Sequence, residues 1–380
     1  MDGESLRIIH CFRSPVGGIF RHVRDLVYEH SRAGHQVGIL CDSTTGGSFE
    51  DKLFEEIQGD LALGVTRLPI GRSVGPSDLA ALWSAYKQIK SLQPDVLHGH
   101  GAKGGALARV IGSALRANKY RVARLYSPHG GSMHFVGKGI KGAVVFTLER
   151  LLKRFGDAMV FVCAYERDVF IRQIGKPARM RVVYNGLKPE EFEPVTPASD
   201  RRDFLFIGML RDLKGPDLFI NAFAEAERKA GRPLSALMIG DGPDEAKYRD
   251  FAVNQGYGRR IPIFPSQRQR DAFEKVRTVV LSSRGDTLPY IVLEAIAAGL
   301  PVIAFGVGGV PEILGRGNPG LVPPGDVDRL AEVMAESVHN HDDWAKRMMP
   351  DPEFFRQKFS REHMASDIMA IYREILADQA

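Results

Sequence analysis

The sequence has few cysteines and no long apolar run. Its 380 residues include three cysteines, Cys11, Cys41 and Cys163, which lie too far apart for a CxxC motif or a disulfide framework. They are typical of free thiols in a reducing compartment. No stretch of about 18 uninterrupted apolar residues is present that could cross a bilayer. The N-terminus, MDGESLRIIHCF, begins with acidic residues and has too short an apolar run for a signal peptide. We therefore expect a cytoplasmic protein.

Signatures of nucleic-acid binding are also missing. The sequence has no helix-turn-helix, zinc-finger or aromatic-plus-basic RNA-binding pattern, so we expect no nucleic-acid partner. The net charge is +5, and residues 1–190 hold 27 Lys and Arg against 17 Asp and Glu, whereas the remainder holds 24 against 29. This asymmetry suggests that the first half meets an anionic phospholipid surface or a phosphorylated substrate. Two unequally charged solvated surfaces explain it equally well.

Short β-rich segments alternate with amphipathic helical segments along the whole chain. Such alternation is typical of parallel sheets with helical crossovers, and the length favours two domains. We predict an α/β fold of two Rossmann-like domains whose sheets face each other across a cleft. The segment EPVTPASDRRD is rich in Pro, Ser and Asp, which is typical of a linker. The predicted boundaries are 1–192 for an acceptor domain, 193–203 for the linker, 200–354 for a donor domain, and 355–380 for a helix that returns to the first domain.

Two carboxylates eight positions apart follow a predicted strand of the second domain. Asp286 lies just before a helix that we expect to include Pro289 in its first turn and to end at Gly299, and Glu294 lies about two turns into it. Backbone amides of the first turn would form an anion site. The residues concerned are Leu288, Tyr290 and Ile291. Taken singly, Asp286 is explained by helix capping and Glu294 by a solvated helix surface.

Cations and glycines follow other strands. Arg211 and Lys214 lie in the turn after the second domain's first strand, where two cations suit a departing pyrophosphate. Gly17 and Gly18 follow the first strand of the chain and would let its backbone approach a phosphate closely. The GDGPDE segment at 240–245 begins like a dinucleotide fingerprint but lacks its last glycine, so we interpret it as a turn.

These motifs together resemble those of a known enzyme family. The segments GGIFRHVRDL, SPHG, VVYNGL, GMLRDLKG, MIGDGP and DTLPYIVLEAIAAGLPVIA, in this order and spacing, are similar to the family 4 glycosyltransferases. These are retaining enzymes of the GT-B architecture, which has two Rossmann-like domains, and the resemblance covers essentially the full length. The family's first acid is usually a glutamate followed by glycine, where this chain has Asp286 and Thr287.

The resemblance implies a role for each candidate residue in binding a donor sugar nucleotide. Glu294 would hold the ribose hydroxyls and Asp286 the hydroxyls of the transferred sugar. The diphosphate would lie against the basic pair and the opposing glycine loop, which are Arg211, Lys214, Gly17 and Gly18. The nucleobase normally lies near a Phe-x-Gly turn, where this chain has IFPSQ at 263–267.

Histidines mark the ends of strands in the first domain. His129 matches the family histidine that lies against the transferred sugar, and the alternative is a buried histidine bonded to backbone. His98 and His100 have alternating strand spacing and point the same way. A metal site is the alternative there, but no third ligand follows in sequence, so we favour a structural or acceptor-side role. Lys103, at the next helix start, is a candidate for an acceptor phosphate.

Three further segments carry polar or basic residues with more than one interpretation. Asp326 and Asp328 spell DxD before an apolar-periodic helix, so we predict a helix cap and no obligatory metal. We interpret Asn185 as a left-handed turn residue. The segment 135–156 combines apolar and basic side chains, which suits either a peripheral helix on an anionic bilayer or a core helix with a basic solvent face.

The sequence therefore predicts a retaining glycosyltransferase without a cofactor. It would move a hexose from a UDP-, GDP- or ADP-sugar to a saccharide or lipid-linked saccharide in cell-surface polysaccharide synthesis, such as that of lipopolysaccharide. A sugar-nucleotide epimerase, a phosphorylase and a non-catalytic nucleotide-sugar sensor remain alternatives.

Overall fold

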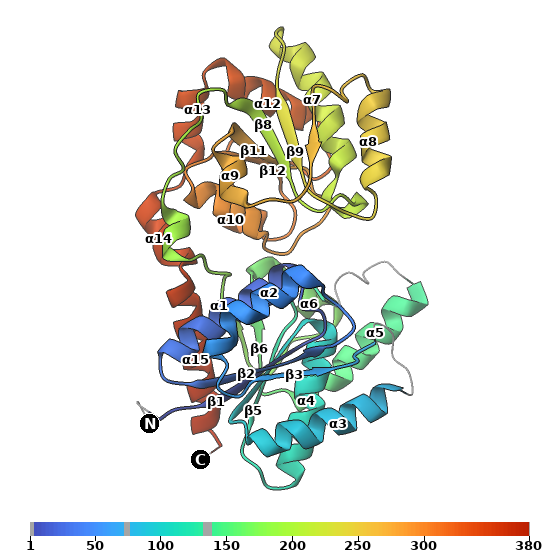
Figure 1. The fold of residues 1–380 in the computed structure, drawn as a ribbon, viewed down its shortest axis with the longest axis vertical. Helices are drawn as coiled ribbons and strands as arrows, with labels where there is room; N and C mark the ends of the chain where they lie inside the picture. The colour runs from blue at the N-terminus through green and yellow to red at the C-terminus, as the bar shows by residue number, and fades with distance from the viewer. Residues whose placement is uncertain (1–3, 72–76, 132–138, 380) are drawn as a thin grey trace. The chain divides into compact units, whose positions relative to one another are not determined.

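The computed structural model describes residues 4–71, 77–131 and 139–379. The chain forms two compact units, one of residues Met1–Gly186 with Arg361–Ala380 and one of residues Leu187–Ser360. Both units are α/β and consist of a parallel sheet with helices around it (Figure 1). The predicted fold class, two Rossmann-like domains, is confirmed.

The first unit is built on a seven-stranded sheet with the order β3-β2-β1-β4-β5-β6-β7, and every neighbouring pair is parallel. The strands are β1 (Arg7–Phe12), β2 (Gln36–Asp42), β3 (Val65–Leu68), β4 (Val96–His100), β5 (Ala123–Ser127), β6 (Ala158–Phe161) and β7 (Met180–Val182). The α-helices are α1 (Gly17–Arg32), α2 (Ser48–Ile57), α3 (Ser77–Leu92), α4 (Gly101–Ala117), α5 (Gly139–Leu152), α6 (Ala164–Gln173) and α15 (Arg361–Ala377).

Alternation along β1 directs its side chains to the two faces of this sheet. Ile8 belongs to a buried cluster with Leu26 of α1 and Tyr372 of α15. Ile9 belongs to a different cluster, with Ile89 of α3 and residues of α4. Strands buried on both faces consist largely of apolar residues, so the polar histidines of β1 and β4 stand out.

The second unit is built on a six-stranded parallel sheet with the order β10-β9-β8-β11-β12-β13. The strands are β8 (Arg202–Ile207), β9 (Ala236–Ile239), β10 (Ile263–Phe264), β11 (Val276–Leu281), β12 (Val302–Phe305) and β13 (Leu321–Val322). The α-helices are α7 (Pro216–Ala230), α8 (Glu245–Asn254), α9 (Gln269–Phe273), α10 (Tyr290–Ala297), α11 (Val310–Leu314), α12 (Val327–His339), α13 (His341–Met348) and α14 (Pro352–Phe359). Helices α7 and α12 pack against each other (Figure 1).

The segment 193–203 belongs to the second unit and does not lie between the two units. The amide of Val195 donates to the backbone carbonyl of Ala298 at 3.0 Å, and the amide of Ala198 donates to the backbone carbonyl of Glu274 at 2.9 Å. The chain instead leaves the first unit after Gly186 and re-enters it at Arg361, where α15 begins. Among the described residues, no helix combines the length and the apolar character that a bilayer crossing needs.

Candidate functional site

The strand order of each sheet reverses at one point. In the second unit the chain moves outward through β9 and β10 on one side of β8, then returns to β11 on the other side. Ligands of open parallel sheets bind outside the carboxyl ends of the strands at such a switch point. The loops after β8 and β11 carry Arg211, Lys214 and Asp286, so these three of the sequence-predicted donor residues lie at this switch point.

The loop after β8 has a fixed shape. It contains a short 3-10 turn, Asp212–Lys214, and Gly215 adopts a φ of 65° before α7 begins. A Cβ on Gly215 would lie 2.1 Å from the carbonyl oxygen of Ser282, so no side chain fits there. The Ser282 hydroxyl in turn donates to the Gly215 carbonyl at 2.8 Å. The loops after β8 and β11 are thus held together by a side-chain hydrogen bond and by close backbone packing.

Lys214 and Asp286 contact each other across these loops. The ammonium group of Lys214 lies 2.5 Å from Oδ2 of Asp286, and Oδ1 of Asp286 accepts from the Thr287 amide at 3.1 Å. Asp286 does not cap α10, because the N-cap of that helix is Pro289. Arg211 is partly buried at the start of the 3-10 turn and forms no salt bridge with any residue that the structure describes.

Helix α10 places the second carboxylate. It begins at Tyr290, so Pro289 stands before the first turn instead of inside it, because its extended ψ of 120° is not helical. The helix ends as predicted, with Gly299 at a φ of 85°. Glu294 is only 6% exposed, which excludes the solvated helix surface considered from sequence. Leu288 is buried, and Tyr290 and Ile291 are partly exposed.

The corresponding switch point of the first unit lies between β1 and β4. Gly17 and Gly18 open α1 just after β1, and Gly17 has a φ of 65°. Lys103 lies in the first turn of α4, directly after β4. A Cβ on Gly104 would lie 2.1 Å from the carbonyl oxygen of Cys11, so α4 packs directly on β1. The predicted glycine loop and Lys103 are therefore at the carboxyl end of this sheet.

The predicted histidines lie in one group, in which His98 and His100 are buried and His129 is partly exposed. The rings of His98 and His100 are 4.1 Å apart, so they point the same way as expected. His98 has both nitrogens engaged, at 2.7 Å from the Tyr372 hydroxyl and at 2.8 Å from that of Ser127, which fits a structural role. Nδ1 of His100 lies 3.0 Å from Nε2 of His129. His129 has a φ of 49°, a left-handed conformation that is rare outside glycine and marks a constrained turn.

Sequence reasoning missed two other histidines of this group. His10 on β1 places Nδ1 3.0 Å from Nε2 of His100, and the ring of His22 on α1 lies 4.7 Å from that of His129. Nδ1 of His22 lies 3.2 Å from Oδ1 of Asn185. Asn185 was predicted to be a left-handed turn residue, and this is wrong, because it is not among the described residues with a positive φ. The HxH pattern on β4 and the SPHG segment gave sequence signals for His98, His100 and His129, whereas His10 and His22 come from separate elements and had none.

Burial keeps these histidines uncharged at neutral pH. Loss of hydration lowers the pKa of His22 to about 4, although the contact with Asn185 opposes this shift. Burial likewise lowers the pKa of His100 and of His129 well below the usual value, and neighbouring histidines add to the effect. These rings therefore present lone pairs and neutral N–H groups.

Glu166 is a further residue that sequence reasoning missed. Its carboxylate is fully buried and accepts from the Gly130 amide at 2.6 Å and from the Val162 amide at 2.9 Å. Burial raises its pKa to about 7, and the two amides only partly offset this. Glu166 thus fixes the turn that carries His129.

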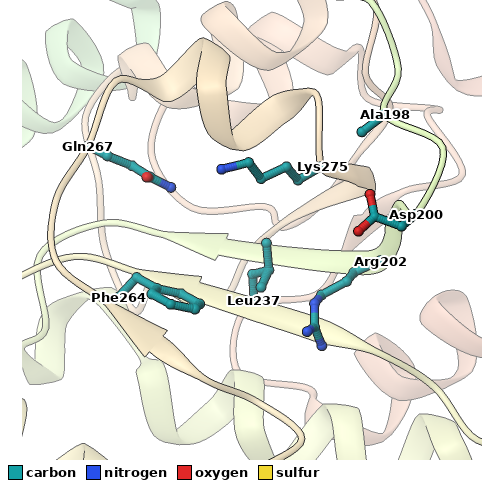
Figure 2. A pocket seen from close by; sticks show the side chains of 7 residues that line it. All are labelled: Ala198, Asp200, Arg202, Leu237, Phe264, Gln267 and Lys275. Atoms are coloured by element: carbon teal, nitrogen blue, oxygen red, sulfur yellow. The ribbon is translucent and has the colours of Figure 1, made fainter.

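Two other features lie away from these residues. Asp326 caps α12 by accepting from the Arg329 amide at 2.9 Å, which confirms the predicted helix cap. A hollow of about 300 Å³ is bordered by Leu237 and Phe264 (Figure 2). The hollow includes Arg202, the first residue of β8. The loop with Arg211 follows Ile207, the last residue of the same strand. This hollow is therefore not at the switch point.

Comparison with known proteins covers both units. The family model described as Glycosyltransferase Family 4 matches residues 16–191, and that described as Glycosyl transferases group 1 matches residues 201–340. An uncharacterized glycosyltransferase of Methanocaldococcus jannaschii is 24% identical to this chain over 372 residues, which cover 95% of each protein.

Solved structures with the same fold span nearly the whole chain. HepE of Anabaena, in complex with UDP-glucose, matches with a TM-score of 0.80 and 17% identity, covering 97% of this chain and all of that one. WaaG, a glycosyltransferase involved in lipopolysaccharide biosynthesis, matches with a TM-score of 0.72 and 14% identity, covering 97% of this chain and 99% of that one. At these identities the likeness establishes the fold.

Proposed function

Because the chain belongs to the glycosyltransferases of the GT-B architecture, we propose that it moves a hexose from a nucleotide diphosphate sugar to a hydroxyl group, with retention at the anomeric carbon. The acceptor in this proposal is a saccharide or a lipid-linked saccharide of a cell-surface polysaccharide. The likeness to WaaG supports this acceptor class, and the complex of HepE with UDP-glucose supports UDP-sugars as the first donors to test.

The observation that carries the proposal is the contact between Lys214 and Asp286 in two loops locked together at a switch point. As the bond from the anomeric carbon to the diphosphate breaks, negative charge grows on the leaving oxygen. Lys214 and Arg211 would stabilise that charge without any metal. Asp286, which lies next to Lys214, would accept hydrogen bonds from the sugar hydroxyls, and Glu294 would accept those of the ribose.

His129 would contribute by position and not by charge. The family resemblance assigns it to the transferred sugar, and its lowered pKa leaves the ring neutral at pH 7. A neutral imidazole can orient a sugar hydroxyl through a hydrogen bond. Glu166, through Gly130, would hold the turn in place.

Peripheral membrane binding forms part of the proposal, and α5 supports it. One side of this helix packs inward, where Glu149 and Leu152 are buried. Its other side and the turn after it expose apolar side chains at helical spacing, namely Ile140, Val144, Leu148, Leu151 and Phe155. Arg150 and Arg154 are exposed beside them. An apolar face bordered by cations suits the surface of an anionic bilayer.

The test is incubation of the chain with labelled UDP-, GDP- and ADP-sugars and candidate acceptors, followed by NMR of the product's anomeric configuration. Transfer with retention supports the proposal. Conversion of the donor without any acceptor would indicate an epimerase, and dependence on inorganic phosphate would indicate a phosphorylase. Donor binding without turnover in a folded sample would indicate a sensor, and each of these three results contradicts the proposal.

A further inference from the structure

The buried histidines include a group with the geometry of a metal site. One nitrogen from each of His22, His100 and His129 lies within 4.8 Å of the others. Two nitrogens that share a tetrahedral zinc ion, each 2.0–2.1 Å from it, are about 3.3 Å apart. Nδ1 of His100 and Nε2 of His129 are 3.0 Å apart, so small side-chain rotations admit an ion between them.

The hydrogen bonds leave one nitrogen of His22 for a ligand. Its Nδ1 is engaged by Oδ1 of Asn185, an oxygen that can only accept, so Nδ1 carries the proton and Nε2 has a lone pair. This Nε2 is buried and has no hydrogen-bond partner among the residues that the structure describes. A buried lone pair without a partner is costly, and a bound cation would satisfy it.

The remaining contacts match the surroundings of known metal ligands. Metal-bound histidines usually donate their second nitrogen to an oxygen or other acceptor, which orients the ring. Asn185 serves His22 in this way, and Nδ1 of His10 lies 3.0 Å from the second nitrogen of His100. His129 is partly exposed, which leaves room for water as a fourth ligand.

A second group, His10, His98 and His100, also has nitrogens within 4.8 Å of one another. It is a poorer site, because both nitrogens of His98 already bond to hydroxyls. From these contacts we propose that His22, His100 and His129 bind one divalent transition-metal ion of the zinc class, with neutral imidazole ligands.

The ion proposed at His22, His100 and His129 is not a requirement of sugar transfer. The carboxylate of Glu166 accepts a hydrogen bond from the amide of Gly130, the residue after His129. If the proposed function holds, an ion on Nε2 of His129 would withdraw that nitrogen from the sugar, and metal would inhibit transfer. Metal binding itself does not rest on the proposed function and is measured without substrate.

The experiment uses the full chain, without a histidine tag, titrated with Zn²⁺ against a chromophoric chelator. One tight equivalent is expected, and Co²⁺ in its place should give the strong visible absorption of tetrahedral coordination. His22→Gln should weaken Zn²⁺ binding at least about 100-fold, and Asn185→Ala about 10-fold. His98→Gln, a buried histidine of the other group, is the matched control and should keep the affinity of the unchanged chain.

Three results would overturn the proposal. One is the absence of a tight equivalent in the unchanged chain, and another is a Co²⁺ spectrum typical of six-coordinate binding. The third is a loss of affinity in His98→Gln with none in His22→Gln, which would assign the ion to the other group. The Co²⁺ spectrum is recorded on the unchanged chain, so the test remains decisive if a variant fails to fold.

Discussion

Asp286 and Lys214 satisfy each other in the structure, so a bound donor must compete with their contact. Asp286→Asn keeps the size of the side chain and removes the negative charge that holds Lys214. We expect turnover of the sugar nucleotide to fall about 100-fold, since a group that contacts the reacting sugar is lost. The affinity for the free nucleoside diphosphate, which has no sugar, should stay the same or rise because Lys214 is released.

The matched control is Asp217→Asn, which removes the carboxylate that pairs with Arg284 at 2.5 Å beside the same loop. Its turnover should change less than about threefold, as expected for a partly exposed ion pair. Steady-state kinetics and calorimetry with the nucleoside diphosphate provide both readouts. Equal losses of turnover and of diphosphate affinity in Asp286→Asn would contradict the role assigned to this residue.

At the scale of elements, helix α7 has a left-handed glycine at each end, and substitutions of the two can be compared. Gly215 precedes the helix with a φ of 65°, and Gly231 follows it with a φ of 64°. A Cβ at Gly231 meets nothing within 4 Å, whereas one at Gly215 would lie 2.1 Å from the Ser282 carbonyl oxygen. Gly231→Ala should cost about 1 kcal/mol of unfolding free energy, from backbone strain alone.

Gly215→Ala should cost clearly more than Gly231→Ala, because the loops after β8 and β11 must also separate. It should therefore lower kcat/KM for the donor, while Gly231→Ala leaves it unchanged. Urea unfolding and donor kinetics measure the two effects. Similar stability and activity in both variants would show that the two loops are not locked as described.

Helix α5 provides a second prediction at this scale. Ile140 and Val144 are 85% and 63% exposed, and placing charge on them leaves the core intact. Ile140→Asp with Val144→Asp should reduce co-sedimentation with anionic phospholipid vesicles at least about tenfold. Val253→Asp, at an equally exposed apolar residue of α8, should bind like the unchanged chain. Equal binding to zwitterionic and anionic vesicles would count against the proposed surface.

Many of the helices and strands could be predicted from the sequence. The amphipathic segments became α1, α3, α7 and α12 because their 3.6-residue periodicity matches a buried face. β3 and β13 have weak sequence signals, since Val65–Leu68 alternates without a buried core residue and Leu321–Val322 has only two residues. Local patterns placed Asp286 and Lys214 in loops, but the contact between them depends on strand order.

The histidine group shows why the tertiary contacts of the candidate site could not be predicted from the sequence. His10, His22 and His129 come from a strand, a helix and a turn, and only the folded sheet brings them to one place. Glu166 had no sequence signal either, because its contact with the turn of His129 is made to the amide of Gly130, which lies 36 residues away in the chain. Side chains that act through tertiary neighbours leave no periodic trace in the sequence.

For the whole molecule, the buried histidines predict how stability depends on pH. Burial lowers the pKa of His22 and of His30 to about 4, whereas an unfolded chain titrates them near 6.5. Between these values the unfolded chain binds more protons, so stability is full above about pH 6.5 and falls as the pH approaches 4. Glu166, with a pKa raised to about 7, acts in the opposite direction but is a single group.

We expect acid to weaken the first unit selectively. Hydrogen exchange followed by mass spectrometry at pH 7.5 and 5.0, corrected for intrinsic rates, should show loss of protection in β1, β4 and α1. Protection in β8 and β11 should change much less, since the histidines with strongly lowered pKa values all lie in the first unit among the described residues. Equal losses in both units would contradict this account.

The central claim is that the loop after β8 holds the diphosphate of a sugar nucleotide through Arg211 and Lys214. It is tested most directly by calorimetric titration of the full chain with UDP, GDP and ADP. We predict one-to-one binding of one of these nucleotides and at least about a 100-fold loss of affinity in Arg211→Ala with Lys214→Ala. Unchanged affinity in that folded double variant, or no binding of any of the three nucleotides, would contradict the claim.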